Sequence, residues 1–158
     1  MFSTQVILIA LNVVAFCLLW WRGRLLDRLA VVLLVLGTAG SFAFGGVIWK
    51  GAYVGVFLVD ALCFVGLWIL AERANRWWIV LTAGFQLIGT LAHFAPFLAH
   101  ERLAWAQVTL MWAIWVLVGL TAFFGVWEVE ADRRFALEGR HGSKLVVGGG
   151  AGAAAAME

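Results

Sequence analysis

The chain has 158 residues, of which 65% are hydrophobic and 13% are charged. An ordinary soluble domain is roughly 45–50% apolar and roughly 25% charged, so this composition excludes a soluble globular protein and a disordered one. The only cysteines, Cys17 and Cys63, lie in apolar runs, which excludes a disulfide-rich scaffold. We therefore expect an integral membrane protein without a sizeable water-soluble catalytic domain.

Charged residues divide the chain into five apolar segments. Charges collect where a chain leaves the lipid, and a spanning helix needs about 20 apolar residues. The pattern predicts an all-α polytopic fold with five transmembrane helices, over residues 4–21, 29–49, 52–71, 77–99 and 103–127. The bundle is expected over residues 1–140, with the fifth helix continuing into a charged stretch. Residues 141–158, rich in glycine and alanine, are predicted to be a flexible low-complexity tail, natural or appended.

The basic residues predict the orientation in the membrane. Lys50 and Arg102 fall on one side, and the other nine fall on the opposite side. The positive-inside rule therefore places the N-terminus outside and the C-terminus in the cytoplasm. The first segment lacks a basic n-region and a small-residue cleavage site, so we interpret it as a retained helix. Eight of the ten tryptophans lie near segment ends and are predicted to anchor the helices at the headgroups: Trp20, Trp21, Trp49, Trp68, Trp77, Trp78, Trp105 and Trp127.

The short connections predict which helices are neighbours. Tight turns at residues 50–51 and 100–102 make the second and third helices, and the fourth and fifth, antiparallel pairs. Gly37, Ser41 and Gly45 are spaced by four and form a small-residue stripe, which favours close helix packing within the chain or, alternatively, dimerisation. No internal repeat is visible, and an odd number of helices argues against an inverted-repeat transporter within one chain.

Asp60 is the one acid predicted to lie in the middle of a span, about ten residues from either end of its helix. Such a group costs at least about 2.5 kcal/mol at the bilayer centre, so it should face protein or water and have a partner. At about 100° per residue, Gln86, Thr90 and His93 fall on one narrow face of the next helix, at a depth similar to that of Asp60. Tyr53 and His100 lie toward the outer side and are candidates for its access route.

Two interpretations of this polar cluster remain open. Asp60, Gln86, Thr90 and His93 form a proton relay or binding site, or they only hold the helices together, with a protonated carboxyl donating to Gln86 or Thr90. Additional polar residues could join the same interior, although each alone is typical of a packing hydrogen bond: Asn12, Gln107 and Thr121.

The sequence predicts no cofactor and no metal site. His93 and His100 are seven residues apart on one helix, about 10.5 Å along its axis, and cannot be the two axial ligands of one haem. His141 lies in the tail, so a haem or chlorophyll-type pigment would be held by His93 or His100 alone. No haem-attachment, zinc or serine-hydrolase motif is present.

The middle of the chain carries a set of short motifs: Asp60, then Ala74-Asn75-Arg76-Trp77-Trp78, then Gly84-Phe85-Gln86-Leu87, and finally His93. In these motifs it resembles the small, Trp-rich, uncharacterised inner-membrane proteins common in alphaproteobacterial genomes. The resemblance covers roughly a third of the chain. It implies a bacterial inner membrane and singles out Asp60, Gln86 and His93, but it brings no activity with it.

We expect an accessory or structural subunit of a larger inner-membrane complex, with an energy-transducing complex as one candidate, rather than an enzyme. The expectation follows from short loops, abundant apolar surface and the lack of catalytic motifs. The predicted partners are the lipid bilayer and other membrane subunits, and not nucleic acid. One alternative is a small proton-linked transporter or channel that acts as a homo-oligomer. A single-histidine haem or pigment protein is the third interpretation.

Overall fold

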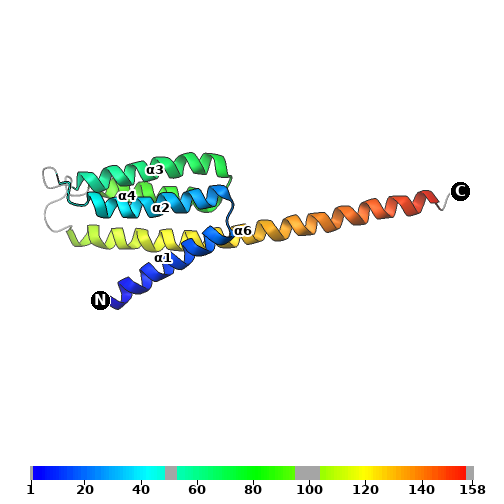
Figure 1. The fold of residues 1–158 in the computed structure, drawn as a ribbon, viewed down its shortest axis with the longest axis horizontal. Coiled ribbons are helices and arrows are strands. Elements are labelled where there is room, and N and C mark those ends of the chain that lie inside the picture. Colours follow the sequence, from blue (N-terminus) through cyan, green and yellow to red (C-terminus); the bar gives the residue numbers. More distant parts are fainter. Residues whose placement is uncertain (1, 49–52, 95–103, 156–158) are drawn as a thin grey trace.

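The computed structural model describes residues 2–48, 53–94 and 104–155, and the side chains of 6–48, 53–94 and 108–138. Over these residues the chain is all-helical (Figure 1), as predicted, with helices α1 (Phe2–Arg22), α2 (Leu25–Phe44), α3 (Val54–Ala74), α4 (Trp77–Ala92) and α6 (Ala104–Ala155). Among the residues whose side chains are described, three helical segments are long and apolar enough to cross a membrane: Leu25–Phe44, Val54–Ala74 and Val108–Glu138. The apolar parts of α1 and α4 are shorter. The chain is therefore an α-helical membrane protein, while five spans and the orientation of the termini stay predictions.

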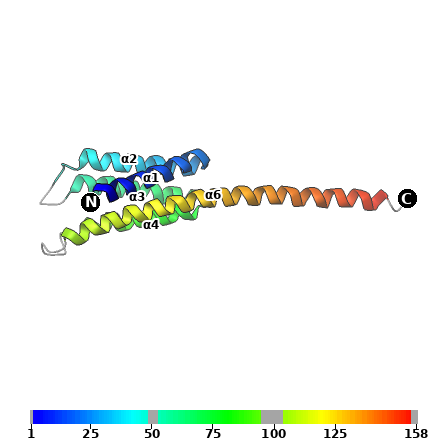
Figure 2. The same cartoon turned by 90° about the horizontal axis from the view of Figure 1, so that it is seen from below.

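The described helices form a ring of contacts, in which each helix packs against two neighbours. Helix α3 lies against α2 and α4, α4 also packs against α6, and α1 packs against α6 and touches α2. The prediction that the second and third helices, and the fourth and fifth, are neighbours is confirmed. Figure 1 shows that the N-terminal end of α1 diverges from the bundle, and Figures 1 and 2 show that α6 continues far beyond the other helices.

Helix α2 begins and ends earlier than the predicted segment 29–49. It begins at Leu25 because Asp27 Oδ2 accepts the backbone N–H of Arg24 at 2.8 Å, which satisfies a donor at the helix N-terminus. It ends at Phe44, where Gly45 is the C-cap and Gly46 follows. Neither the Asp27 hydrogen bond nor the two glycines are visible in the hydropathy pattern. The predicted boundaries of this helix were therefore wrong by about four to five residues.

The boundaries of α3 and α4 also differ from the predicted segments 52–71 and 77–99. Helix α3 continues to Ala74, beyond the charges expected to end it, and stops where Asn75 adopts a left-handed conformation with φ of 48°. Helix α4 stops at Ala92, with His93 as its C-cap. Pro96 follows three residues later and has no N–H to bond the carbonyl of Ala92. Segment 77–99 is therefore not one continuous helix.

Helix α6 is 52 residues long, or about 78 Å. It includes residues 104–127 of the predicted span 103–127 and the charged stretch after it, and it remains helical to Ala155, so most of the predicted low-complexity tail is helical in the structure. Glycines at positions 148–150 each cost about 1 kcal/mol relative to alanine in a helix, which makes this the part of α6 with the weakest intrinsic helix propensity. Flexibility of the tail stays a prediction.

The small residues of α2 bring it close to α3. A Cβ added to Gly37 would lie 3.1 Å from Cys63 Sγ, and one added to Gly40 would lie 3.0 Å from a methyl carbon of Val59. Ser41 donates to the carbonyl of Gly37 in its own helix at 2.9 Å, and Gly45 is the C-cap. Of the three residues of the predicted stripe, Gly37 thus lies in the α2–α3 contact. Gly40, which is not part of the stripe, lies in the same contact.

Trp78 is the largest fully buried side chain of the described residues. Its predicted role as an interfacial anchor is wrong, because α6 closes over its indole ring at a glycine. A Cβ added to Gly125 would lie 2.7 Å from Cγ of Trp78. The close approach of α4 and α6 therefore depends on the absence of a side chain at Gly125.

We expect Gly125→Ala to lower the free energy of unfolding by about 1–3 kcal/mol, since the added methyl overpacks the contact with Trp78. Gly84→Ala is the matched control on α4, because a Cβ there meets nothing within 4 Å. That control should be neutral or stabilising by up to about 1 kcal/mol. Unfolding midpoints in a mild detergent compare the two, and equal midpoints would contradict the close contact.

Candidate functional site

Asp60 lies in α3, six residues after Val54 and fourteen before Ala74. At 1.5 Å per residue it is about 9 Å from the Val54 end of the helix. The predicted central position is therefore shifted toward this end, because α3 begins later and ends later than segment 52–71. The acid is half-buried in the bundle at roughly one third of the length of its helix.

The carboxylate of Asp60 contacts two side chains of α4. His93 Nε2 lies 2.8 Å from Asp60 Oδ2, and Gln86 Nε2 donates to Asp60 Oδ1 at 3.2 Å. The side chains of His93 and Asp60 are only 13% and 19% exposed. Phe57 covers the imidazole edge-on, with ring centroids 6.2 Å apart. The structure thus brings Asp60, Gln86 and His93 together into a shielded cluster, which we call the Asp60 cluster.

The other residues predicted to join this site lie apart from the carboxylate. Thr90 is buried on α4, but its hydroxyl donates to the backbone carbonyl of Gln86 at 2.9 Å and not to Asp60. Tyr53 is exposed at the N-cap of α3 and makes no hydrogen bond to the cluster within the described residues. His100 lies outside the described residues, so its proposed place on an access route stays a prediction.

Two of the additional polar candidates lie deeper in the bundle. Asn12 Nδ2 donates to Leu8 O at 2.9 Å, while its Oδ1 is buried without a hydrogen-bond partner where α1 meets α6. Thr121 of α6 shares a 3.0 Å hydrogen bond with Thr82 of α4, and both hydroxyls are buried. The side chain of Gln107 lies outside those described. None of these contacts reaches Asp60.

Two small cavities adjoin the Asp60 cluster, and both are lined by Asp60 and Gln86. One, of about 20 Å³, lies against α2 and includes Gly37, Ser41 and Cys63 in its lining. The other, of about 40 Å³, lies against α6 and includes Ile114 and Val118. These volumes admit about one or two water molecules, with polar atoms of Asp60 and Gln86 to bind them. They are far too small for a haem or chlorophyll ring.

The chemistry that the Asp60 cluster can perform is proton exchange. If Nε2 carries the proton, the imidazole donates to the carboxylate, and if the carboxyl carries it, the acid donates to the ring. One proton can therefore reside on either residue of the same 2.8 Å contact, while Gln86 holds the second carboxylate oxygen. Among the described residues, no group of three or more His, Cys, Asp or Glu side chains could hold a metal ion.

A second buried polar cluster, which the sequence did not predict, lies at the opposite end of α4. Trp78 Nε1 donates to Asp27 Oδ1 at 2.8 Å, and Asp27 is 1% exposed. Glu128 of α6 accepts the backbone N–H groups of Trp77 and Trp78 at 3.2 and 3.3 Å. Arg76, also buried, pairs with Asp132 at 2.7 Å. These contacts join the N-terminal ends of α2 and α4 to the middle of α6.

Comparisons with known proteins give limited similarity. No family model and no solved structure matches the chain. It is similar to the phospho-N-acetylmuramoyl-pentapeptide-transferase of Saccharopolyspora erythraea, with 30% identity over 142 residues, or 81% of this chain and 34% of that enzyme. The enzyme of the same name from Kineococcus radiotolerans is 28% identical over 120 residues, or 74% of this chain and 30% of that enzyme. The chain thus spans about a third of the length of the curated relatives it matches.

Proposed function

We propose that this protein is an accessory or structural subunit of a larger assembly in a bacterial inner membrane, with five spans, its N-terminus outside and its C-terminus in the cytoplasm. The observation that carries this proposal is the extension of α6 beyond the bundle, visible in Figures 1 and 2. A hydrocarbon core is only about 30 Å thick, whereas α6 is about 78 Å long. More than half of the helix therefore projects outside the lipid.

The composition of the projecting part supports docking to another protein. Beyond Asp132, the last acid that pairs with the bundle, it carries further charges, and Phe135 is 71% exposed on it. Most helical stability in proteins comes from tertiary packing, and the glycines near the end of α6 lower its intrinsic helix propensity. A partner surface that covers Phe135 would supply the tertiary contacts that normally stabilise a helix of this kind.

Copurification tests this proposal. A tagged full-length protein, extracted in mild detergent, should bring down one or more other membrane proteins in fixed ratio. A variant that ends at Arg140 and a Phe135→Ala variant should lose or weaken this association, while the unfolding midpoint of the bundle stays unchanged. A full-length chain that always runs alone, or only as a homo-oligomer, would contradict the proposal.

A second candidate function is proton-linked transport through a homo-oligomer, favoured by the Asp60 cluster. A carboxylate and an imidazole 2.8 Å apart, beside cavities that admit water, have the features of a proton-transfer site within a membrane. The same cavities are too small for a solute, so this candidate concerns protons and would need further polar groups from a second copy or from the residues outside those described.

For this second candidate, we expect Asp60→Asn to reduce proton flux to background in proteoliposomes that carry a pH-sensitive dye, because the amide cannot exchange a proton with His93. Glu72→Gln is the matched control, since it makes the same chemical change at an exposed acid of α3. Flux that is unchanged in Asp60→Asn would exclude Asp60 as the relay.

The two similar transferases suggest group transfer as a further function, but the structure gives it no specific support. The chain spans about a third of those enzymes, and the two cavities that touch Asp60 admit only water. Neither cavity is lined by His93, so the cavities give no support to the third interpretation, a pigment or haem bound at His93 or His100. We therefore propose neither a transferase nor a haem protein.

A further inference from the structure

The connection between α1 and α2 carries three arginines and one acid within seven residues: Arg22, Arg24, Asp27 and Arg28. In the sequence, the negative charge of Asp27 offsets part of the positive charge of the three arginines. In the structure Asp27 turns inward, and both of its oxygens accept hydrogen bonds from within the bundle, Oδ1 from Trp78 and Oδ2 from the backbone of Arg24. The acid is therefore withdrawn from the surface and presents no carboxylate oxygen there.

The three arginines differ in their partners. Arg22 pairs with Glu130 of α6 at 3.2 Å. Arg24 and Arg28 are exposed, and neither has a carboxylate within ion-pair distance among the described residues. Arg24 is the N-cap residue of α2, with an extended backbone, and Arg28 lies in the first turns of the helix. Two exposed guanidinium groups without a counter-charge thus lie at the start of α2.

The guanidinium group of Arg28 is held in place by α1. Its Nε donates to the carbonyl of Trp20 at 3.0 Å, and its central carbon lies 5.9 Å from the centroid of the Trp20 ring. The Nε contact leaves the two terminal nitrogens free to donate elsewhere. A guanidinium oriented in this way is ready to bind a planar or tetrahedral oxyanion through two parallel hydrogen bonds.

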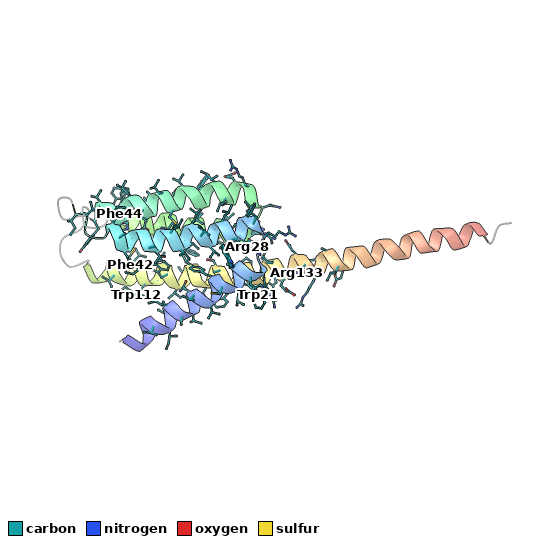
Figure 3. The ribbon with its side chains drawn as sticks, viewed as in Figure 1. Trp21, Arg28, Phe42, Phe44, Trp112 and Arg133 are labelled. Carbon is teal, nitrogen blue, oxygen red and sulfur yellow. The ribbon has the colours of Figure 1, made fainter. Side chains whose placement is uncertain are left out.

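Large exposed apolar side chains lie close to these arginines in the sequence. Trp21 is 80% exposed and Leu25 is 72% exposed, and both flank Arg24 in the sequence. Figure 3 shows Trp21 and Arg28 at the same end of the bundle. Exposed tryptophan and leucine next to unpaired arginines are typical of the boundary between headgroups and acyl chains. A partner for this surface must therefore be anionic at one end and apolar at the other.

We propose that Arg24 and Arg28, together with Trp20, Trp21 and Leu25, form a binding site for the phosphate headgroup of an anionic phospholipid. The two guanidinium groups bind the phosphate, and the acyl chains lie along Trp21 and Leu25. A phospholipid of the surrounding bilayer fits the site because it supplies both the negative charge and the apolar tails at this depth. An acidic segment of a protein would supply the charge alone.

The test measures lipid binding to the full-length protein in detergent by native mass spectrometry, with phosphatidylglycerol and phosphatidylcholine as probes. The wild-type protein should retain phosphatidylglycerol preferentially. Arg24→Gln/Arg28→Gln should weaken this binding by about tenfold or more, the effect of losing about 1.4 kcal/mol or more of charge-assisted hydrogen bonding. Arg24→Lys/Arg28→Lys should lie between the two, since lysine keeps the charge but not the paired donors.

The matched control is Arg133→Gln/Arg134→Gln, which removes two exposed arginines from α6 and should leave phosphatidylglycerol binding unchanged. Circular dichroism of each variant without lipid shows whether the helices still form, and the lysine variant serves if the glutamine variant does not fold. Equal losses in both glutamine variants would mean that only net charge matters, and the site would be refuted. Displacement of the lipid by a soluble acidic peptide at equal concentration would also overturn the lipid assignment.

Discussion

Trp78→Ala should lower the free energy of unfolding by about 3–5 kcal/mol, because it removes the largest fully buried side chain of the described bundle and leaves a cavity between α4 and α6. It also leaves Asp27 Oδ1 without its indole donor in a site that is closed to water. Chemical unfolding in a mild detergent, followed by tryptophan fluorescence and circular dichroism, measures the change.

Trp77→Ala is the natural control for this prediction. The neighbouring indole is 72% exposed, and its truncation should change the free energy of unfolding by less than about 0.5 kcal/mol. Trp78→Phe separates the two contributions, since it keeps most of the ring volume but loses the N–H, and should cost about 1–3 kcal/mol. If Trp77→Ala and Trp78→Ala were equally destabilising, the burial of Trp78 would be wrong.

The helical fold could be predicted from the charge pattern, whereas the helix boundaries could not. Charges separate the apolar segments, so the order of the helices and the pairing of neighbours follow from the sequence. The helix ends depend on local hydrogen bonds and backbone conformations that are not visible in the hydropathy pattern. Asp27 begins α2 four residues before the apolar run, and left-handed Asn75 ends α3 after two further charged residues. The length of the apolar segment 77–99 also gives no indication that helix α4 ends at Ala92.

The Asp60 cluster could be predicted in part, because helical periodicity places Gln86 and His93 on one face and depth counting places Asp60 opposite them. Their contact needs the packing of α3 on α4, which the structure shows. The Asp27–Trp78 contact, in contrast, was not predicted from the sequence. Both residues sit at segment ends, where charge and tryptophan are usually solvated, and only the tilt and approach of α2, α4 and α6 bury them.

A double-mutant cycle on Asp60 and His93 should give a coupling free energy of about 1–2 kcal/mol, which would establish the contact energetically. Asp60→Ala alone should lower the free energy of unfolding by about 1–3 kcal/mol, because His93 and Gln86 both lose their acceptor in a shielded site. Asp60→Asn should cost less, since the amide oxygen can still accept from either donor. The measurement is again unfolding in detergent, with the four proteins of the cycle compared at one pH.

Thr90→Ala provides the control cycle, because Thr90 lies on the same face of α4 yet bonds to the backbone of its own helix. Its coupling to Asp60 should be near zero, within about 0.3–0.5 kcal/mol. A Thr90 coupling as large as that of His93 would mean that the polar face of α4 acts as a whole and that the Asp60–His93 bond has no special strength. A large coupling for His93 alone would instead single out the bonded pair on which the proton-transfer candidate depends.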